Sequence, residues 1–250
     1  MEKFFNINER GCSIRCKMYY ADIKSVTRVV ICIHGFAGHK DNKAAARFSE
    51  FVLKKHRDIA VISYDAPCHG DDAKKKLVLD DCALYTDIVA EYARKRFDTD
   101  ELYIYANSFG AYQILKYISE RGNPFRKIAL RCPAVNMYEI LMRIMSPEEI
   151  RTLEKNKPIL GGFDRKVKMT RQFVEDLKKN DITSRDFGSF ADDLKIIQGT
   201  KDEVVSYDLV EAFARKNSIR FVSVENADHR FKDPKKMDVA IKETVDFFGF

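Results

Sequence analysis

Residues 102–110 of the chain read Leu102-Tyr103-Ile104-Tyr105-Ala106-Asn107-Ser108-Phe109-Gly110. The first five residues are apolar or aromatic and predict a buried strand, and the apolar spacing that follows predicts a helix over 112–120. Ser108 therefore lies on a sharp turn between a strand and a helix. Such a turn crowds the backbone and needs small residues two positions before and after the serine, which Ala106 and Gly110 supply. This placement predicts a nucleophile elbow with Ser108 as the nucleophile.

Strands and helices alternate along most of the chain. Short apolar runs, several of them apolar on both faces, predict strands at 29–33, 59–64, 102–106, 128–130, 194–197 and 219–224. Helical spacing of apolar residues predicts helices at 44–55, 84–97, 112–120, 207–216 and 234–248. Residues 4–7 and 13–20 predict an antiparallel pair at the start of the sheet. The fold class is therefore α/β, with a mostly parallel eight-stranded sheet and helices on both faces.

One long segment interrupts this alternation. Residues 134–186 connect two predicted strands, and this connection is far longer than the few residues that normally join such strands. Amphipathic spacing over 138–145 and 170–177 predicts helices, with a Gly-Gly turn between them. We interpret the segment as a small helical cap over the carboxyl ends of the strands, where open α/β sheets bind ligands. Residues 1–133 and 187–250 would then form the core.

The cap has an apolar side that suits a ligand contact. Its methionines can adapt to differently shaped ligands. An insertion that contacts no ligand is the alternative. The cap residues that we expect to contact substrate are Met137, Tyr138, Leu141 and Met145.

Two later strands end in residues suited to activate Ser108. A serine hydroxyl is a weak nucleophile at neutral pH and needs a base, which an acid in turn orients. Asp202 and His229 each follow one of the last two predicted strands, in the chain order Ser, acid, His. Because parallel strands end at one edge of a sheet, we expect these side chains to converge on Ser108. Asp228 and Glu203 are alternative acids.

The negative charge of an acyl-transfer intermediate needs preorganised donors. One should be the backbone N–H of Phe109, which opens the helix after Ser108. The other should come from the glycine-containing loop at 34–38, most directly from the backbone N–H of Phe36. We expect structural support for this loop and for the elbow from His34, Gly35 and Gly110.

Composition and charge exclude several classes of protein. The chain has 250 residues, of which 45% are hydrophobic and 33% charged, and this balance is typical of a globular protein rather than a disordered one. Its net charge of +6 is spread without a basic stripe, so we expect no nucleic-acid partner. The sequence has no apolar run long enough for a membrane-spanning helix or a signal peptide. We therefore expect no membrane partner and a cytoplasmic location.

The cysteines and histidines do not predict a metal or cofactor. The six cysteines form no CxxC pair and are expected to be reduced thiols. His34 and His39 are not accompanied by a carboxylate or a cysteine at metal-ligand spacing. The expected partner is a small-molecule ester substrate, and a homodimer is compatible with the sequence.

Several strings together resemble a known family. They are His34-Gly35-Phe36-x-Gly38, Asp65-x-Pro67-x-His69-Gly70-Asp71, Asn107-Ser108-Phe109-Gly110, Gly199-x-x-Asp202-x-x-Val205 and His229. Over nearly its whole length the chain resembles the α/β-hydrolase superfamily. More narrowly, it resembles the small bacterial serine esterases grouped with serine-aminopeptidase-like hydrolases, which include the cinnamoyl (feruloyl) esterases. The resemblance implies Ser108 as nucleophile, His229 as base, Asp202 as acid, and an oxyanion hole at the N–H groups of Phe36 and Phe109.

The chain departs from the family pattern at two places. Ala106 replaces the first glycine of the elbow, and Phe109 stands where the family often has Gln or Met. The loop after the second parallel strand lacks the arginine of the family's Arg-Gly-His-Gly-Ser type of string, since Ala66-Pro67-Cys68 precedes His69. Neither change affects the three triad residues.

The function predicted is hydrolysis of carboxylic esters with a short or aromatic acyl group, hydroxycinnamoyl esters among them. A thioesterase and an aminopeptidase-like serine peptidase are alternatives, because the same groups serve any acyl transfer. Glu148-Glu149 is a candidate for binding a peptide amino terminus, although a solvated helix start explains the pair as well. A ligand-binding protein without catalysis is the alternative from a different class.

Overall fold

A sheet of eight strands, in the order β1-β2-β4-β3-β5-β6-β9-β10, forms the centre of the computed structural model, which describes residues 1–72, 76–162 and 165–250. β1 and β2 pair antiparallel, β2 pairs antiparallel with β4, and the remaining neighbours pair parallel. The eight-stranded, mostly parallel sheet with an antiparallel start is confirmed. Its strands are β1 (Glu2–Glu9), β2 (Cys12–Tyr20), β3 (Arg28–Ile33), β4 (Ile59–Tyr64), β5 (Leu102–Asn107), β6 (Lys127–Arg131), β9 (Leu194–Gly199) and β10 (Arg220–Val224).

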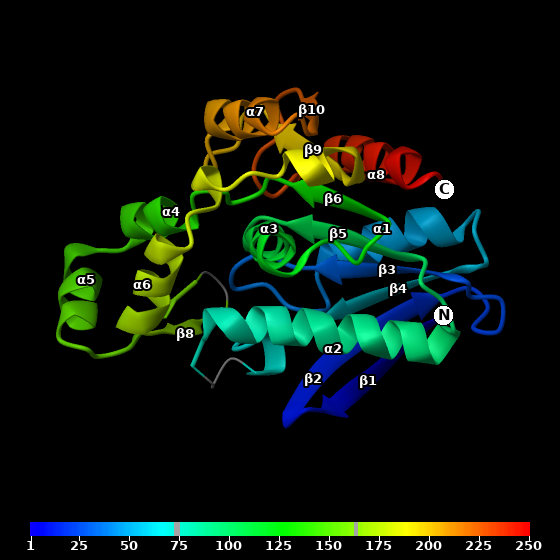
Figure 1. The fold of residues 1–250 in the computed structure, drawn as a ribbon, viewed down its shortest axis with the longest axis horizontal. Helices are drawn as coiled ribbons and strands as arrows, with labels where there is room; N and C mark the ends of the chain where they lie inside the picture. Colours follow the sequence, from blue (N-terminus) through cyan, green and yellow to red (C-terminus); the bar gives the residue numbers. More distant parts are fainter. Residues whose placement is uncertain (73–75, 163–164) are drawn as a thin grey trace.

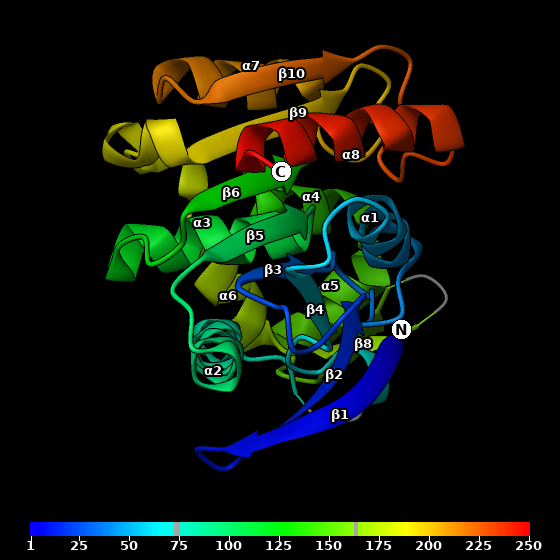
Figure 2. The same cartoon turned by 90° about the vertical axis from the view of Figure 1, so that its right-hand side faces the viewer.

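Helices cover both faces of the sheet (Figures 1 and 2). α1 (Lys43–Leu53) and α8 (Pro234–Phe248) lie on one face, and α2 (Leu79–Phe97), α3 (Phe109–Arg121) and α7 (Tyr207–Lys216) lie on the other. Each face has its own hydrophobic cluster. Along β3 the buried side chains alternate between the two: Val30 and Cys32 join the α1/α8 cluster, whereas Ile31 joins the α2/α3 cluster. This explains why the parallel strands are apolar on both faces.

The segment between β6 and β9 lies beyond the strand ends toward which β3, β5 and β6 point (Figure 1). We call residues 134–186 the cap segment. Two of its helices begin at ordinary capping signals: Ser146 forms a capping box with Glu149, and Thr170 accepts from the N–H of Phe173. Its elements are α4 (Met137–Ile144), α5 (Pro147–Glu154), β7 (Ile159–Gly161), β8 (Val167–Met169), α6 (Arg171–Lys179) and the 3-10 helix η2 (Ile182–Ser184).

The two helices predicted in the cap segment are present as α4 and α6. The segment also contains a small two-stranded sheet that was not predicted, because β7 and β8 pair antiparallel. Each strand has three residues, too short for an alternating pattern to be visible in the sequence. The Gly161-Gly162 pair, which predicted a turn between helices, lies at the end of β7.

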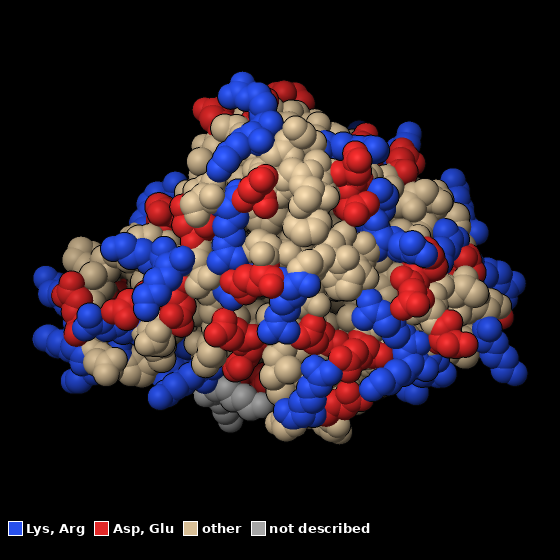
Figure 3. All heavy atoms as spheres, viewed as in Figure 1, with Lys and Arg blue, Asp and Glu red and all other residues tan. Residues whose placement is uncertain are grey.

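Charges of both signs are mixed over the face shown in Figure 3, without a stripe of one sign. This distribution agrees with the small net charge. Within the described ranges, no helix combines the length and the apolar character that crossing a membrane requires.

Candidate active site

Ser108 occupies a strained turn between β5 and α3. Its φ of 53° and ψ of −120° lie outside the usual regions for a residue with a side chain, and its backbone N–H donates to the carbonyl of Arg131 at 3.0 Å. A Cβ atom on Gly110 would lie 2.5 Å from the carbonyl oxygen of His34. Glycine at this position therefore lets the start of α3 pack directly against the end of β3.

The structure brings Ser108, His229 and Asp202 together. The Nε2 atom of His229 lies 3.0 Å from the Oγ atom of Ser108, and its Nδ1 atom lies 2.9 and 3.0 Å from the two carboxylate oxygens of Asp202. The side chain of Asp202 is fully buried, and that of His229 is 13% exposed. A serine, a histidine and a buried acid are thus linked by hydrogen bonds in the order that nucleophile activation requires.

Asp202 accepts several hydrogen bonds besides that of His229. The backbone N–H groups of Val204 and Val205 donate to one oxygen at 2.9 and 2.8 Å, and Nε2 of Gln198 donates to the other at 2.9 Å. Burial alone raises the pKa of Asp202, but the hydrogen bonds from His229 and from the backbone N–H of Val205 outweigh it and lower the pKa below its ordinary value. The acid is therefore ionised at neutral pH and is held in one orientation.

The two alternative acids have other partners. Asp228 accepts from the backbone N–H of Lys232 at 2.9 Å and lies 3.4 Å from its ammonium group. Glu203 accepts from the backbone N–H of His229 at 3.0 Å, so it holds the histidine loop rather than the imidazole ring.

The loop after β3 lies against the elbow. A Cβ atom on Gly35 would lie 3.0 Å from the Cβ atom of Ser108, so a glycine is needed for this close approach. With its amide oriented to satisfy both of its groups, Asn107 accepts from the N–H of Gly35 and donates to the carbonyl of Ile33, each at 3.3 Å. Gly35 therefore lies against Asn107 and Ser108. The candidate oxyanion residues Phe36 and Phe109 are the next residues along these two segments.

The side chains of the two oxyanion candidates pack on each other. The rings of Phe36 and Phe109 are 5.8 Å apart and nearly perpendicular, and Phe109 is fully buried. Among the backbone bonds of loops and turns between described residues, neither Phe36 nor Phe109 is a donor. Their role as an oxyanion hole for Ser108 stays a prediction.

His34 supports this loop, as its sequence position suggests. Its Nδ1 atom lies 2.8 Å from the carbonyl oxygen of Gly35, and its Nε2 atom accepts from the backbone N–H of Ala66 at 3.1 Å. Burial lowers the pKa of His34 to about 4, so the ring is neutral and both of its nitrogens are occupied. Nearby His69 is also buried, with a pKa lowered to about 3, and its Nδ1 atom lies 2.8 Å from the carbonyl oxygen of Pro67.

A buried lysine, which the sequence reasoning missed, ties together the loops after β3 and β4. The ammonium group of Lys40 lies 3.1 Å from a carboxylate oxygen of Asp65 and 2.6 Å from one of Asp71. The other carboxylate oxygen of Asp65 accepts from the backbone N–H of Lys40 at 2.7 Å. Burial alone lowers the pKa of Lys40, but the two aspartates raise it above its ordinary value. The loop that lacks the family arginine is thus held by a lysine from the neighbouring loop.

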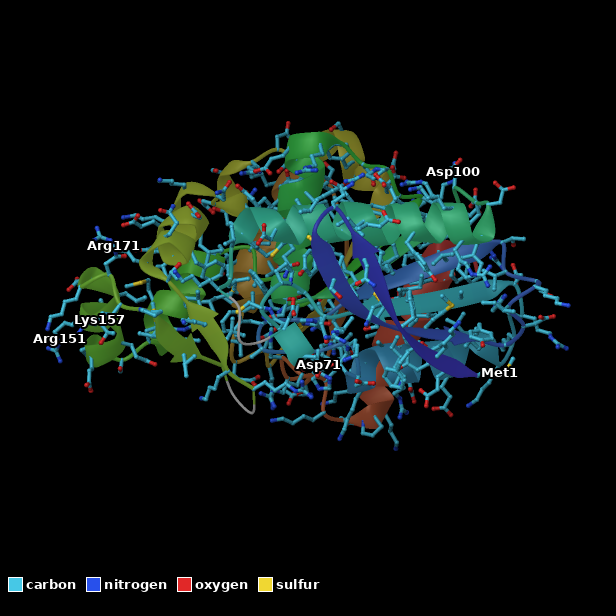
Figure 4. All side chains as sticks on the ribbon, turned by 90° about the horizontal axis from the view of Figure 1, so that it is seen from below. Met1, Asp71, Asp100, Arg151, Lys157 and Arg171 are labelled. Carbon is cyan, nitrogen blue, oxygen red and sulfur yellow. The ribbon has the colours of Figure 1, made fainter. Side chains whose placement is uncertain are left out.

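The cap segment packs closely on the elbow. Phe173 of α6 contacts Phe109 edge-to-face, with ring centres 6.2 Å apart. A Cβ atom on Gly162 would lie 2.8 Å from the Cβ atom of Ala37, so the end of β7 lies against the loop after β3. Figure 4 places Asp71 between the cap segment and the first two strands, whereas Arg151, Lys157 and Arg171 lie at the outer end of the cap. The labelled cap cations therefore lie away from Asp71.

The cap residues predicted to contact substrate are mostly packed inward. Met137, Leu141 and Met145 are at least 92% buried and belong to the main hydrophobic cluster, whereas Tyr138 is only partly buried. Met137 and Tyr138 also border a small cavity between α4 and α6. Their contact with substrate stays a prediction.

Among the residues that the structure describes, three side chains of kinds that can bind a metal ion lie close together. A sulfur of Cys132, a carboxylate oxygen of Asp202 and a ring nitrogen of His229 all lie within 4.8 Å of one another. The oxygens of Asp202 already accept hydrogen bonds from N–H groups, and the pKa of the buried Cys132 thiol is raised well above its ordinary value. The carboxylate of Asp202 in this cluster is therefore engaged in hydrogen bonds, one of which orients the ring of His229.

The fold and the site define an α/β hydrolase with a serine-centred site. Residues 24–158, more than half of the chain, match the profile of the family described as serine aminopeptidase, S33, and the chain belongs to this family. No curated protein gives a significant match.

Solved structures share the fold at low sequence identity. Est1E from Butyrivibrio proteoclasticus, in a structure with ferulic acid bound, is 18% identical over 97% of each chain, with a TM-score of 0.76. A putative hydrolase from Agrobacterium vitis S4 is 16% identical over 99% of this chain and 98% of its own, with a TM-score of 0.72. The esterase domain of a Rhodothermus marinus protein is 14% identical over 100% of this chain and 98% of its own, with a TM-score of 0.70.

Proposed function

We propose that this protein is a serine hydrolase that cleaves carboxylic esters through an acyl-enzyme on Ser108. The observation that carries the proposal is the continuous hydrogen-bonded series Ser108, His229 and Asp202. Its geometry matches the requirement that a base lie within hydrogen-bond reach of the proton it removes.

In the proposed reaction, the Oγ atom of Ser108 attacks the ester carbonyl carbon while its proton passes to Nε2 of His229. The carbonyl oxygen becomes negatively charged and accepts from the N–H groups of Phe36 and Phe109. As the C–O bond to the alcohol breaks, His229 gives its proton to the departing oxygen. A water molecule, deprotonated by His229, then attacks the acyl-enzyme, and His229 passes this proton to the departing Oγ atom of Ser108 as the acid is released.

The substrate class that we favour has a short or aromatic acyl group. The solved structure of Est1E with ferulic acid, which shares the fold, supports an aromatic acid as the acyl part. The aromatic character of the contacts at the elbow, from Phe36, Phe109 and Phe173, agrees with a weakly polar neighbourhood. Methyl hydroxycinnamates and short nitrophenyl esters are therefore the first substrates to test.

The second candidate is an aminopeptidase-like activity, which the description of the family favours. Glu148 and Glu149 are poor candidates for holding a peptide amino terminus. Glu149 accepts from the N–H of Ser146 at 2.8 Å within a capping box, so the pair marks the start of α5. Thioester hydrolysis is a further candidate on the same residues.

The test combines a covalent probe with a substrate panel. A fluorophosphonate should label the wild-type protein and should not label Ser108→Ala, while Ser119→Ala, a serine on the last turn of α3, is the matched control and should be labelled normally. Absence of labelling in wild type would favour a ligand-binding protein without catalysis. Faster turnover of thioesters or aminoacyl amides than of any ester would move the assignment to those activities.

A further inference from the structure

Arg131, the last residue of β6, contacts the elbow through its main chain. The backbone N–H of Ser108 donates to the carbonyl of Arg131 at 3.0 Å, and Arg131 pairs with Asn107 in the register of β5 and β6. Only 3% of Arg131 is exposed. The sheet therefore fixes the position of this residue relative to the nucleophile.

The side chain of Arg131 reaches the loop that carries His229. Its Nη1 atom donates to the backbone carbonyl of Arg230 at 3.3 Å, and its guanidinium carbon lies 5.1 Å from the ring centre of Phe231. These two residues directly follow His229. Hydrogen bonds from charged groups and cations over aromatic rings are both stabilising contacts. Arg131 thus joins the main chain of the nucleophile to the loop of the base.

The loop after His229 has a backbone that its surroundings must hold. Phe231 has a φ of 53°, a conformation that residues with side chains adopt rarely, and its N–H donates to the carbonyl of Asp228 at 3.1 Å. Phe231 is 2% exposed and belongs to the hydrophobic cluster on the α1/α8 face. Such a conformation persists where neighbouring contacts determine it, and the guanidinium of Arg131 is one of these contacts.

The burial of Arg131 is unfavourable for stability by itself. A buried cation lowers the free energy of unfolding unless an anion compensates it. Among the described residues, the side-chain hydrogen bonds of Arg131 go to the carbonyl of Arg230 and, at 3.7 Å, to the sulfur of Met237, rather than to a carboxylate. Within the same ranges its Nε atom has no hydrogen-bond partner. The contacts with the loop of His229, rather than stability, therefore explain a cation at this place.

We propose that Arg131 is a positioning residue for the triad: its guanidinium holds the loop after His229 and so keeps the imidazole within reach of Ser108. The inference rests on the proposed function, because it assigns a role within the same site. The side-chain bonds of Arg131 go to Arg230 and to Met237 of α8, so it acts on the reaction through the loop.

The experiment follows fluorophosphonate labelling of Ser108 at increasing probe concentration, which separates the maximal rate from the concentration that gives half of this rate. In Arg131→Met the maximal rate should fall about tenfold, as expected for loss of one hydrogen bond from a charged group. The half-maximal concentration should stay within about twofold of wild type, because the change affects the reacting groups rather than binding of the probe.

Two further measurements distinguish positioning from a structural role. The midpoint of thermal unfolding should not fall in Arg131→Met, because this variant no longer buries an uncompensated cation. Arg131→Lys keeps a cation near the ring of Phe231 and a donor near the carbonyl of Arg230, and its maximal rate should lie within about threefold of wild type.

Phe231→Leu tests the same contact from the side of the loop. It removes the ring, keeps an apolar side chain and should also slow labelling. The double variant with Arg131→Met should be little slower than the slower single variant, because both changes remove one shared contact. Arg47→Met is the matched control and should be labelled as wild type, since Arg47 binds Asp238 of α8 at 2.7 and 2.8 Å on the same face of the sheet.

The outcomes separate this inference from the proposed function. Absence of labelling in wild type would overturn the proposed function and, with it, the role of Arg131. Labelling of wild type with an unchanged maximal rate in Arg131→Met would overturn the positioning role alone. Equal slowing in Arg131→Met and Arg131→Lys, together with a lower thermal midpoint in both, would also overturn it, because the side chain would then only stabilise the fold.

Discussion

The Nε2 atom of His229 lies 3.0 Å from the Oγ atom of Ser108, although 121 positions separate the two residues. Ser108 follows β5, and His229 follows β10, on the opposite side of β6 and β9. The sheet, rather than local chain geometry, therefore sets this distance. The buried carboxylate of Asp202, bonded to Nδ1, fixes the ring so that Nε2 faces the serine.

We expect Asp202→Asn to lower kcat by about 10⁴-fold, because the amide can hold the wrong imidazole tautomer and carries no charge to stabilise the imidazolium. The measurement is ester hydrolysis by a nitrophenyl substrate, with a thermal melt to check folding. Asp228→Asn is the matched control, since Asp228 adjoins His229 but bonds to Lys232. A larger loss in Asp228→Asn than in Asp202→Asn would contradict the assignment of the acid.

We expect Gly35→Ala to lower kcat by about 10²-fold to 10³-fold, the usual effect of losing one oxyanion donor. The new methyl group would meet the Cβ atom of Ser108 at 3.0 Å and displace the loop that carries the N–H of Phe36. Gly188→Ala is the control, because its nearest neighbour is an oxygen of Asp186 at 3.3 Å, far along the chain from the elbow. Unchanged kcat in Gly35→Ala would show that the loop position does not matter for turnover.

We expect Lys40→Met to lower the free energy of unfolding by about 3 kcal/mol, because it leaves the buried carboxylate of Asp65 without its cation. Asp65 is only 1% exposed, and the side chain of Lys40 is 9% exposed. Lys54→Met removes a partner of Glu50 in a pair whose side chains are 70% and 69% exposed, and should change stability by less than about 1 kcal/mol. Urea unfolding measures both, and equal losses would contradict a special role for Lys40.

We expect stability to fall as the pH is lowered from about 6.5 toward 5, in part because of two buried histidines. Burial lowers the pKa of His34 to about 4 and that of His69 to about 3. In this pH window the unfolded chain binds protons on these residues and the folded chain does not. Each therefore contributes a slope of roughly 1 kcal/mol per pH unit, and this slope becomes small at about pH 7.5.

Urea unfolding of wild type and His69→Asn at pH 5.0, 5.5, 6.0 and 7.5 tests this expectation. The free energy of unfolding of the variant should depend less steeply on pH, by the slope that one histidine contributes, even if the variant is less stable at every pH. Parallel curves for the two proteins would mean that His69 is not kept neutral by the fold.

Much of the fold could be predicted from the sequence because its signals are local. Two-sided apolar strands, the serine on a strand-to-helix turn and the order of Ser108, Asp202 and His229 need only short windows and chain order. The position of the acid was predicted for the same reason, since a residue just after a parallel strand lies at the ligand-binding edge. The structure then brings all three side chains into hydrogen-bond distance.

The features that were missed depend on contacts between distant residues. Lys40 and Asp65 are 25 positions apart, and nothing in either loop alone indicates that they pair. The Cys132 sulfur lies within 4.8 Å of Asp202 and His229. This closeness depends on the pairing of β6 with β9, which the sequence around Cys132 does not indicate. The short strands β7 and β8 pair with each other, and the end of β7 lies close to the loop after β3; neither contact has a sequence pattern.

The contact between Phe109 and Phe173 joins the residue that follows Ser108 to α6 of the cap segment. In the reaction that we propose, Phe109 supplies its backbone N–H, and its ring packs against α6. An engineer who replaces the cap segment to change substrate preference must therefore supply a new partner for this ring. Without such a partner, the new segment would displace Phe109 and lower the rate of turnover. Substrate preference could then not be changed without a loss of rate.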